Sequence, residues 1–285
     1  MDASQVQTVG VVGSGIMGSG IAELAARAGS DVVVVERDDQ LLERGRARIE
    51  SSLGKAVERG KLPAEERDAV LERVRGATDL SELDDVDLVI EAATEDIRAK
   101  LEVFRRLDQV TRPEVVLASN TSSLPIGSLA EATKRPAQVV GMHFFNPAPV
   151  MALVELIASE QTSEETFALA EAFAKRLGKT TVRSKDRAGF IVNRLLIPYL
   201  NSAVRLLDDG IATREDIDTA IELGLRHPMG PLRLIDEIGL DTTMHVGNVL
   251  FEAFGDPDDA PPELLKRLVE EGRLGRKSGR GFYDY

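Results

Sequence analysis

The 285-residue sequence has no cysteine and no tryptophan, and aromatic residues make up only 4% of it. Without cysteine the chain has no disulfide, no thiolate metal site, no iron–sulfur cluster and no thiol nucleophile. Only three histidines are present, so a histidine-rich metal site is not expected. No apolar run approaches the ~20 residues of a membrane span, and the N-terminus lacks the basic and apolar regions of a signal peptide. We therefore expect a cytoplasmic protein without a metal site.

Acidic residues outnumber basic ones by 48 to 35, which gives a formal net charge of −13. The average field of such a chain repels polyanions, so nucleic acid and anionic membranes are not expected partners. The charge is unevenly distributed, because residues 41–61 contain six basic and three acidic side chains. A local positive patch suits a small ligand that carries phosphates. An ordinary solvated amphipathic helix explains the same pattern equally well.

The first two-thirds of the chain alternates short β-branched runs with amphipathic stretches. This alternation predicts a parallel sheet with helices on both faces, the doubly wound Rossmann-type arrangement. Long amphipathic helices are expected over residues 16–28, 96–110 and 164–177, and a helical insertion over about 41–76. The expected strands are residues 6–12, 31–35, 86–92, 115–119, 139–145, 153–158 and 179–182.

The strand signal fades near Asp186, and helical spacing continues to the end of the chain. We therefore predict two domains, an α/β domain over residues 1–186 and an all-helical domain over residues 187–285. The expected helices of the second domain are residues 190–207, 214–223, 231–254 and 262–271.

Residues 13–18 read Gly-Ser-Gly-Ile-Met-Gly, directly after the first predicted strand and at the start of a helix. This context is typical of a dinucleotide-binding turn. Gly13 allows the tight turn, Gly15 lets a pyrophosphate approach the backbone, and Gly18 lets the helix pack closely on the sheet. A glycine turn without a ligand is the alternative, and the strand and helix on either side make it the weaker one.

The second predicted strand ends in Glu36, 18 residues after Gly18. A carboxylate at this position accepts hydrogen bonds from the adenine ribose hydroxyls and repels the 2′-phosphate of NADP, which favours NAD. The neighbouring Arg37 is a possible receptor for that phosphate, so both cofactors stay open on this evidence.

Polar segments follow two further strands, at residues 118–124 and 141–151, where a parallel sheet binds its ligand. Across residues 6–285 the sequence resembles the L-3-hydroxyacyl-CoA dehydrogenase family. The matching motifs are the glycine turn, "SNTSSL", "GMHFFNPAPVMALVE", "GFIVNRLLIPYL", "DIDTAIELGLRHPMGPLRLID" and the terminal "GRKSGRGFYDY".

The resemblance implies four catalytic residues. His143 matches the catalytic histidine and Glu155 the carboxylate paired with it. Ser122 matches the serine that holds the 3-oxygen of the substrate. Asn193 matches an asparagine that supports substrate and histidine, and a helix-capping role is its alternative. Because Asn193 belongs to the helical domain, the resemblance implies catalysis in a cleft between the domains.

The resemblance also implies binding residues for NAD and coenzyme A, and a homodimer formed through the helical domain. The insertion at about 41–76 corresponds to a hairpin that contacts coenzyme A in the family. Ser52 and Arg59 stand at contact positions of this hairpin, and Arg59 replaces a lysine of the family. For Glu95 and Lys100 a solvated helix face is the alternative. Substrate contacts are implied for Ser52, Arg59, Ser122 and Asn193. The NAD contacts are Gly13, Gly15, Ile16, Met17, Gly18, Glu36, Glu95, Lys100, Asn120, Ser122, Asn146 and Lys277.

The implied activity is NAD-dependent oxidation of (S)-3-hydroxyacyl-CoA to 3-oxoacyl-CoA and the reverse, on short substrates such as 3-hydroxybutyryl-CoA. One alternative is a dehydrogenase of free hydroxy acids, of the L-gulonate type, which would not need the basic segment at 41–61. A non-catalytic dinucleotide-binding protein is the other, and it would not need Ser122, His143, Glu155 and Asn193 together.

Overall fold

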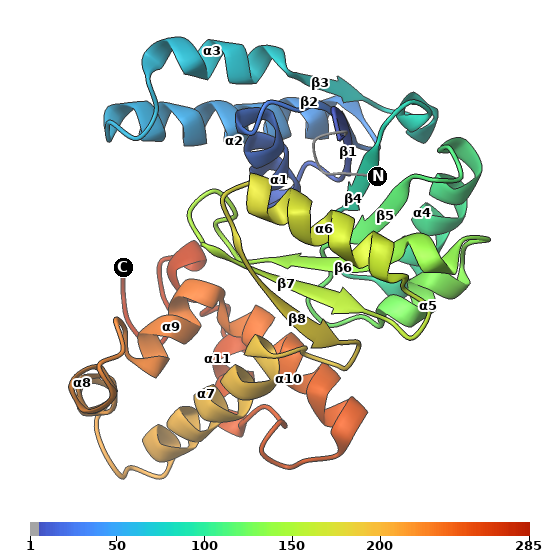
Figure 1. Cartoon of the computed structure of the whole chain (residues 1–285). Coiled ribbons are helices and arrows are strands. Elements are labelled where there is room, and N and C mark those ends of the chain that lie inside the picture. Colours follow the sequence, from blue (N-terminus) through green and yellow to red (C-terminus); the bar gives the residue numbers. More distant parts are fainter. Residues whose placement is uncertain (1–5) are drawn as a thin grey trace. The chain divides into compact units, whose positions relative to one another are not determined.

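The computed structural model describes residues 6–285, and the chain divides after Asp186 into two units (Figure 1). Each unit has a hydrophobic core of its own. Within residues 6–285, no helix combines the length and the apolar character needed to cross a bilayer.

The first unit contains an eight-stranded sheet in the order β3-β2-β1-β4-β5-β6-β7-β8. Neighbouring strands are parallel except β6 and β7, which form an antiparallel pair. Runs such as Val32–Val35 are buried throughout, as expected for a sheet covered on both faces. The doubly wound arrangement predicted from the sequence is therefore confirmed, but the expectation of a parallel sheet was wrong for one pair. Only residues 145–152 connect β6 to β7, too few for the crossover that parallel strands need. The strands are β1 (Thr8–Val12), β2 (Asp31–Val35), β3 (Val74–Ala77), β4 (Leu88–Glu91), β5 (Val116–Ser119), β6 (Val139–Phe144), β7 (Leu153–Ala158) and β8 (Thr180–Lys185).

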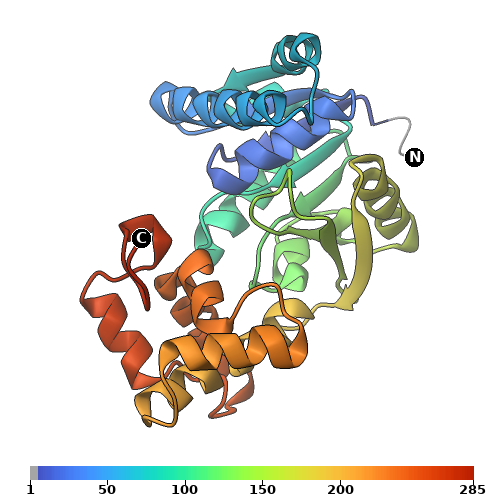
Figure 2. The ribbon, with the colours of Figure 1, turned by 90° about the vertical axis from the view of Figure 1, so that its left-hand side faces the viewer.

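Helices connect these strands and bury their apolar sides against the sheet. Ile21 of the first helix and Phe173 of the last share one core with the strands. The second and third helices form a hairpin beside the first, which Figures 1 and 2 show from two sides. The helices are α1 (Ile16–Arg27), α2 (Asp39–Glu58), α3 (Ala64–Glu72), α4 (Ile97–Val110), α5 (Ile126–Glu131) and α6 (Glu164–Arg176).

The predicted insertion is helical only as far as Glu72, so the sequence prediction was wrong for its last residues. Residues 74–77 form β3, which pairs with β2 at the edge of the sheet. The sequence Val-Arg-Gly-Ala shows no apolar run, because a partly exposed edge strand has little surface to bury.

The second unit is all-helical, with a core that includes Leu200, Leu232 and Leu265. The helix predicted over residues 231–254 is in fact two helices. Gly239 separates them with φ of +103°, a backbone conformation that ends a helix and that glycine adopts without strain. The helices are α7 (Val192–Asp208), α8 (Arg214–Leu225), α9 (Pro231–Ile238), α10 (Leu240–Phe254), α11 (Glu263–Glu270) and the short 3-10 helix η4 (Arg276–Ser278).

The C-terminal tail is tied to this core by a buried carboxylate. Asp236 accepts hydrogen bonds from the backbone N–H groups of Phe282 and Tyr283, at 2.8 and 2.9 Å. A Cβ at Gly281 would lie 1.9 Å from Oδ1 of Asp236, so only glycine fits there. Much of the terminal motif "GRKSGRGFYDY" therefore serves packing.

Candidate active site

The glycine turn lies between β1 and α1, and the space around the Cα atom differs among its three glycines. Gly13 has φ of +99°, and a Cβ there would lie 2.7 Å from the carbonyl oxygen of Ala92. A Cβ on Gly18 would lie 1.9 Å from the carbonyl oxygen of Gly13. Around Gly15, by contrast, no described atom beyond the adjoining backbone comes within 4 Å of that position. Gly13 and Gly18 therefore shape the turn, whereas Gly15 leaves room for a ligand at the start of α1.

This difference predicts opposite effects for two substitutions. Gly18→Val is expected to destabilise the first unit by several kcal/mol, because the side chain would overlap the backbone of the turn. Gly15→Val should leave the unfolding temperature nearly unchanged, because its side chain would enter open space. It should weaken NADH binding, because that space is where the ligand would approach the turn. Thermal unfolding and NADH titration of both variants measure the contrast. Equal losses of stability would contradict it.

Glu36 is held beside this turn by the backbone. The N–H of Ser14 donates to Oε2 of Glu36 at 2.9 Å, and the N–H of Arg37 donates to Oε1 at 3.0 Å. The Arg37 side chain is largely exposed and pairs with Asp38 at 3.5 Å. The carboxylate thus stands at the end of β2, where the ribose of a dinucleotide lies in sheets of this order. A carboxylate at this place favours NAD over NADP, and the contact of Glu36 with the cofactor stays a prediction.

A buried ion pair lies under the ends of β4 and β5. Nζ of Lys100 is 2.6 Å from Oε1 of Glu91, and the two side chains are 1% and 0% exposed. Ser119 donates its hydroxyl hydrogen to the other oxygen of Glu91 at 2.7 Å. The sequence interpretation assigned Lys100 to the cofactor and missed Glu91 and Ser119. The signal available for them was a polar residue at the end of an otherwise apolar strand, Glu91 in β4 and Ser119 in β5.

Glu95 fixes the polar segment that follows β5. Its Oε1 accepts hydrogen bonds from the Thr121 hydroxyl at 2.6 Å and from the Ser122 backbone N–H at 2.9 Å. The hydroxyls of Ser122 and Ser123 donate to the same oxygen, at 3.2 and 3.3 Å. Although burial opposes it, the Lys100 ammonium together with these hydrogen bonds holds the pKa of Glu95 below its ordinary value. The carboxylate therefore stays charged and orients Ser122.

The antiparallel pairing of β6 and β7 places His143 directly opposite Glu155. Nδ1 of His143 lies 2.7 Å from Oε2 of Glu155, and both side chains are buried. The imidazole also packs against Phe145, with ring centroids 4.6 Å apart. Asn120 accepts a hydrogen bond from the Phe144 N–H at 2.9 Å, which joins the end of β5 to the end of β6. The predicted His143, Glu155 and Asn120 thus meet at one edge of the sheet.

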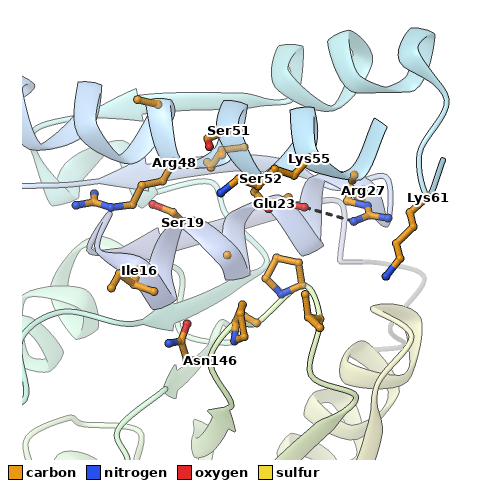
Figure 3. Close-up of a pocket in the computed structure, with 18 of the residues that line it drawn as sticks. Ile16, Ser19, Glu23, Arg27, Arg48, Ser51, Ser52, Lys55, Lys61 and Asn146 are labelled. Atoms are coloured by element: carbon orange, nitrogen blue, oxygen red, sulfur yellow. Dashed lines mark hydrogen bonds and ion pairs between the residues drawn. The ribbon is translucent and has the colours of Figure 1, made fainter. Parts of the chain in front are cut away.

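A cavity of about 860 Å³ lies between α1, α2 and the segment that follows β6 (Figure 3). Ser52 and Arg59 of the hairpin line it, and Asn146 lines it from the opposite side. Its basic lining residues are Arg27, Arg44, Arg48, Lys55, Arg59 and Lys61.

Two predicted residues belong to the second unit. Asn193 stands in the first turn of α7. Lys277 stands in η4, where its Nζ lies 2.6 and 2.7 Å from the two carboxylate oxygens of Asp241. The NAD contact implied for Lys277 stays a prediction.

A histidine–carboxylate pair at the ligand edge of a dinucleotide-binding sheet is the arrangement of a nicotinamide-dependent dehydrogenase. Residues 8–187 match the family model described as 3-hydroxyacyl-CoA dehydrogenase, NAD binding domain. Residues 189–285 match the model for the C-terminal domain of the same family. The chain belongs to the 3-hydroxyacyl-CoA dehydrogenase family.

Relatives with similar sequences span nearly the whole chain. The 3-hydroxybutyryl-CoA dehydrogenase of Mycobacterium tuberculosis is 54% identical, over 98% of this chain and 99% of that one. The human mitochondrial hydroxyacyl-coenzyme A dehydrogenase is 44% identical, over 98% of this chain and 91% of its own. The solved structure of (S)-3-hydroxybutyryl-CoA dehydrogenase PaaH1 from Ralstonia eutropha is 45% identical, with a TM-score of 0.93 and 99% coverage of both chains.

Proposed function

We propose that this chain is an NAD-dependent 3-hydroxyacyl-CoA dehydrogenase that interconverts (S)-3-hydroxybutyryl-CoA and the corresponding 3-oxoacyl-CoA. The observation that carries the proposal is the 2.7 Å contact between His143 and Glu155 at the ligand edge of the sheet. The names of the relatives support the choice of a short acyl substrate.

In this reaction His143 is the acid and base. An ionised Glu155 can only accept a hydrogen bond, so it keeps a proton on Nδ1 and leaves Nε2 to exchange one with the substrate. In the oxidative direction Nε2 takes the hydroxyl proton while the C–H electron pair and hydrogen leave as hydride. NAD, when bound, accepts that hydride. Glu155 stabilises the imidazolium that results, and in reduction the imidazolium returns the proton to the alkoxide oxygen.

Ser122 is proposed to hold the 3-oxygen during this transfer. Its hydroxyl and its backbone N–H both donate to Glu95, so the side chain is positioned before substrate arrives. A hydroxyl has a single hydrogen, so this hydrogen must turn from Glu95 to the 3-oxygen when substrate binds. A substrate contact for Asn193 is proposed from the family resemblance.

The basic cavity is proposed to bind the coenzyme A part of the substrate, with Ser52 and Arg59 among the contacts. Cationic side chains attract the phosphates of such a ligand, whereas a free hydroxy acid of the L-gulonate type would leave them unused. We also propose a homodimer formed through the helical unit, on the family resemblance. A cytoplasmic location stays a prediction.

The proposal is tested by following NADH oxidation with acetoacetyl-CoA as substrate. We expect turnover with acetoacetyl-CoA and none with free acetoacetate. In the oxidative direction, with NAD as cofactor, we expect no NADH to form from gulonate. With NADPH in place of NADH, kcat/KM should fall by about tenfold or more, because the Glu36 carboxylate repels the 2′-phosphate. A chain that turns over no 3-oxoacyl-CoA would refute the proposed activity.

A further inference from the structure

Glu23 is a buried carboxylate on α1 that lines the basic cavity. The residue is 1% exposed. Its Oε1 accepts a hydrogen bond from Nη1 of Arg27 at 3.3 Å. Its buried Oε2 receives no hydrogen bond from any residue between 6 and 285. Figure 3 shows the carboxylate between α1 and α2, next to Ser52. A buried oxygen of this kind is costly unless a donor satisfies it.

The charges around the cavity restrict what such a donor can be. Six basic residues line the cavity, and Glu23 is the one acidic residue among its described lining side chains. A phosphate is attracted to the basic residues and repelled by the carboxylate. The part of a ligand that lies against Glu23 must therefore be uncharged and must carry an N–H or O–H group.

Two protein groups lie near enough to be considered as donors to Glu23. The Ser52 hydroxyl is close enough to lower the pKa of the carboxyl, but it does not reach Oε2 with the geometry of a full hydrogen bond. Nζ of Lys179 donates to the carbonyl oxygens of Ala148 and Met151, at 2.7 and 2.8 Å. Burial raises the pKa of the Glu23 carboxyl, although Ser52, Arg27 and Lys179 counteract the rise. The site is thus costly for the protein by itself, which is the usual mark of a group that serves a ligand.

We propose that Glu23 determines carrier specificity by accepting a hydrogen bond, through Oε2, from an amide or hydroxyl group in the uncharged arm of the acyl carrier. This inference rests on the proposed function, since coenzyme A carries phosphates at one end and an amide- and hydroxyl-bearing arm next to its thioester. Ser52 reaches the same part of the cavity from α2. The basic residues then bind the phosphates, and Glu23 recognises the arm.

Calorimetric titration of Glu23→Leu with two ligands tests this assignment. Coenzyme A carries both phosphates and arm, whereas adenosine 3′,5′-bisphosphate carries phosphates without the arm. Loss of a hydrogen bond to a charged acceptor should weaken coenzyme A binding by about tenfold or more. Binding of the bisphosphate should be unchanged or tighter, because a repulsive charge is removed. Glu23→Gln keeps a carbonyl acceptor and should recover most of the coenzyme A affinity.

Glu171→Leu is the matched control. Glu171 forms the same kind of i,i+4 pair on α6, with Lys175 at 3.1 Å, and does not line the cavity. It should change neither affinity. Unaltered coenzyme A binding by Glu23→Leu, equal losses for both ligands, or a wild-type chain that binds neither ligand would overturn the inference. If wild type binds coenzyme A but turns over no 3-oxoacyl-CoA, the proposed function fails, whereas the Glu23 assignment is still decided by the affinities.

Discussion

Replacing His143 with alanine is expected to lower kcat for the reduction of acetoacetyl-CoA by about 10²–10⁴-fold, the usual contribution of a positioned acid–base group. The substrate oxygen then receives no proton from the imidazolium as hydride arrives at carbon. NADH binding should be nearly unchanged, because the glycine turn and Glu36 lie on other strands. Stopped-flow absorbance at the nicotinamide band and a fluorescence titration of NADH measure the two quantities.

Two further variants distinguish a loss of acid–base catalysis from a general loss of structure. Glu155→Gln keeps the shape of the side chain but removes the charge that stabilises the imidazolium, so it should also lower kcat, by a smaller factor. His227→Ala removes a histidine of the helical unit that packs near Tyr199, and it should leave kcat unchanged. A His143→Ala enzyme that keeps more than a tenth of wild-type kcat would contradict the assigned role.

Replacing Lys100 with methionine should destabilise the first unit by about 3–5 kcal/mol, the typical cost of removing one partner from a buried ion pair. The substitution leaves the Glu91 carboxylate, which is fully buried, without its counter-ion. Glu95 also loses the ammonium 3.4 Å away, which should loosen its hold on Ser122. Differential scanning calorimetry, read for the transition of the first unit, measures the loss.

The double variant Glu91→Gln with Lys100→Met supplies the decisive comparison. With both charges gone, much of the stability should return, because no buried charge is left unpaired. Lys175→Met, which breaks an exposed pair on α6, should cost less than about 1 kcal/mol. A Lys100→Met chain as stable as wild type would show that the Glu91 charge is solvated in another way.

Strong local patterns allowed most of the sheet to be predicted from the sequence. The strands of the sheet interior are apolar β-branched runs, and turns or helix caps such as Asp38 and Asp96 separate them from the helices. The edge strand at residues 74–77 lacks such a run. The break at Gly239 was hidden because the apolar spacing continues on both sides of it.

Site residues could be predicted from the sequence where a single motif contains them. They could not be predicted where two interacting residues belong to different segments of the chain. The glycine turn and the pair of His143 with Glu155 lie within recognisable segments. Glu91 and Lys100 neutralise each other only because α4 folds back over the end of β4, a contact that residue patterns do not reveal. Glu23 has the spacing of an ordinary helix residue, and it becomes a buried carboxylate only in the folded chain, where α2 and residues 146–150 line the same cavity.

The antiparallel register of β6 and β7 has a consequence for how enzymes of this kind diverge. His143 and Glu155 are paired by the backbone ladder, and a slip of one residue would turn Glu155 to the other face of the sheet. The segment between the two strands contributes Asn146 to Val150 to the lining of the basic cavity. If the cavity binds the substrate and His143 transfers the proton, as proposed, mutations in this segment can alter which substrate is accepted while the ladder keeps His143 and Glu155 paired. Substrate preference could then evolve in the connecting segment without a change in the acid–base pair.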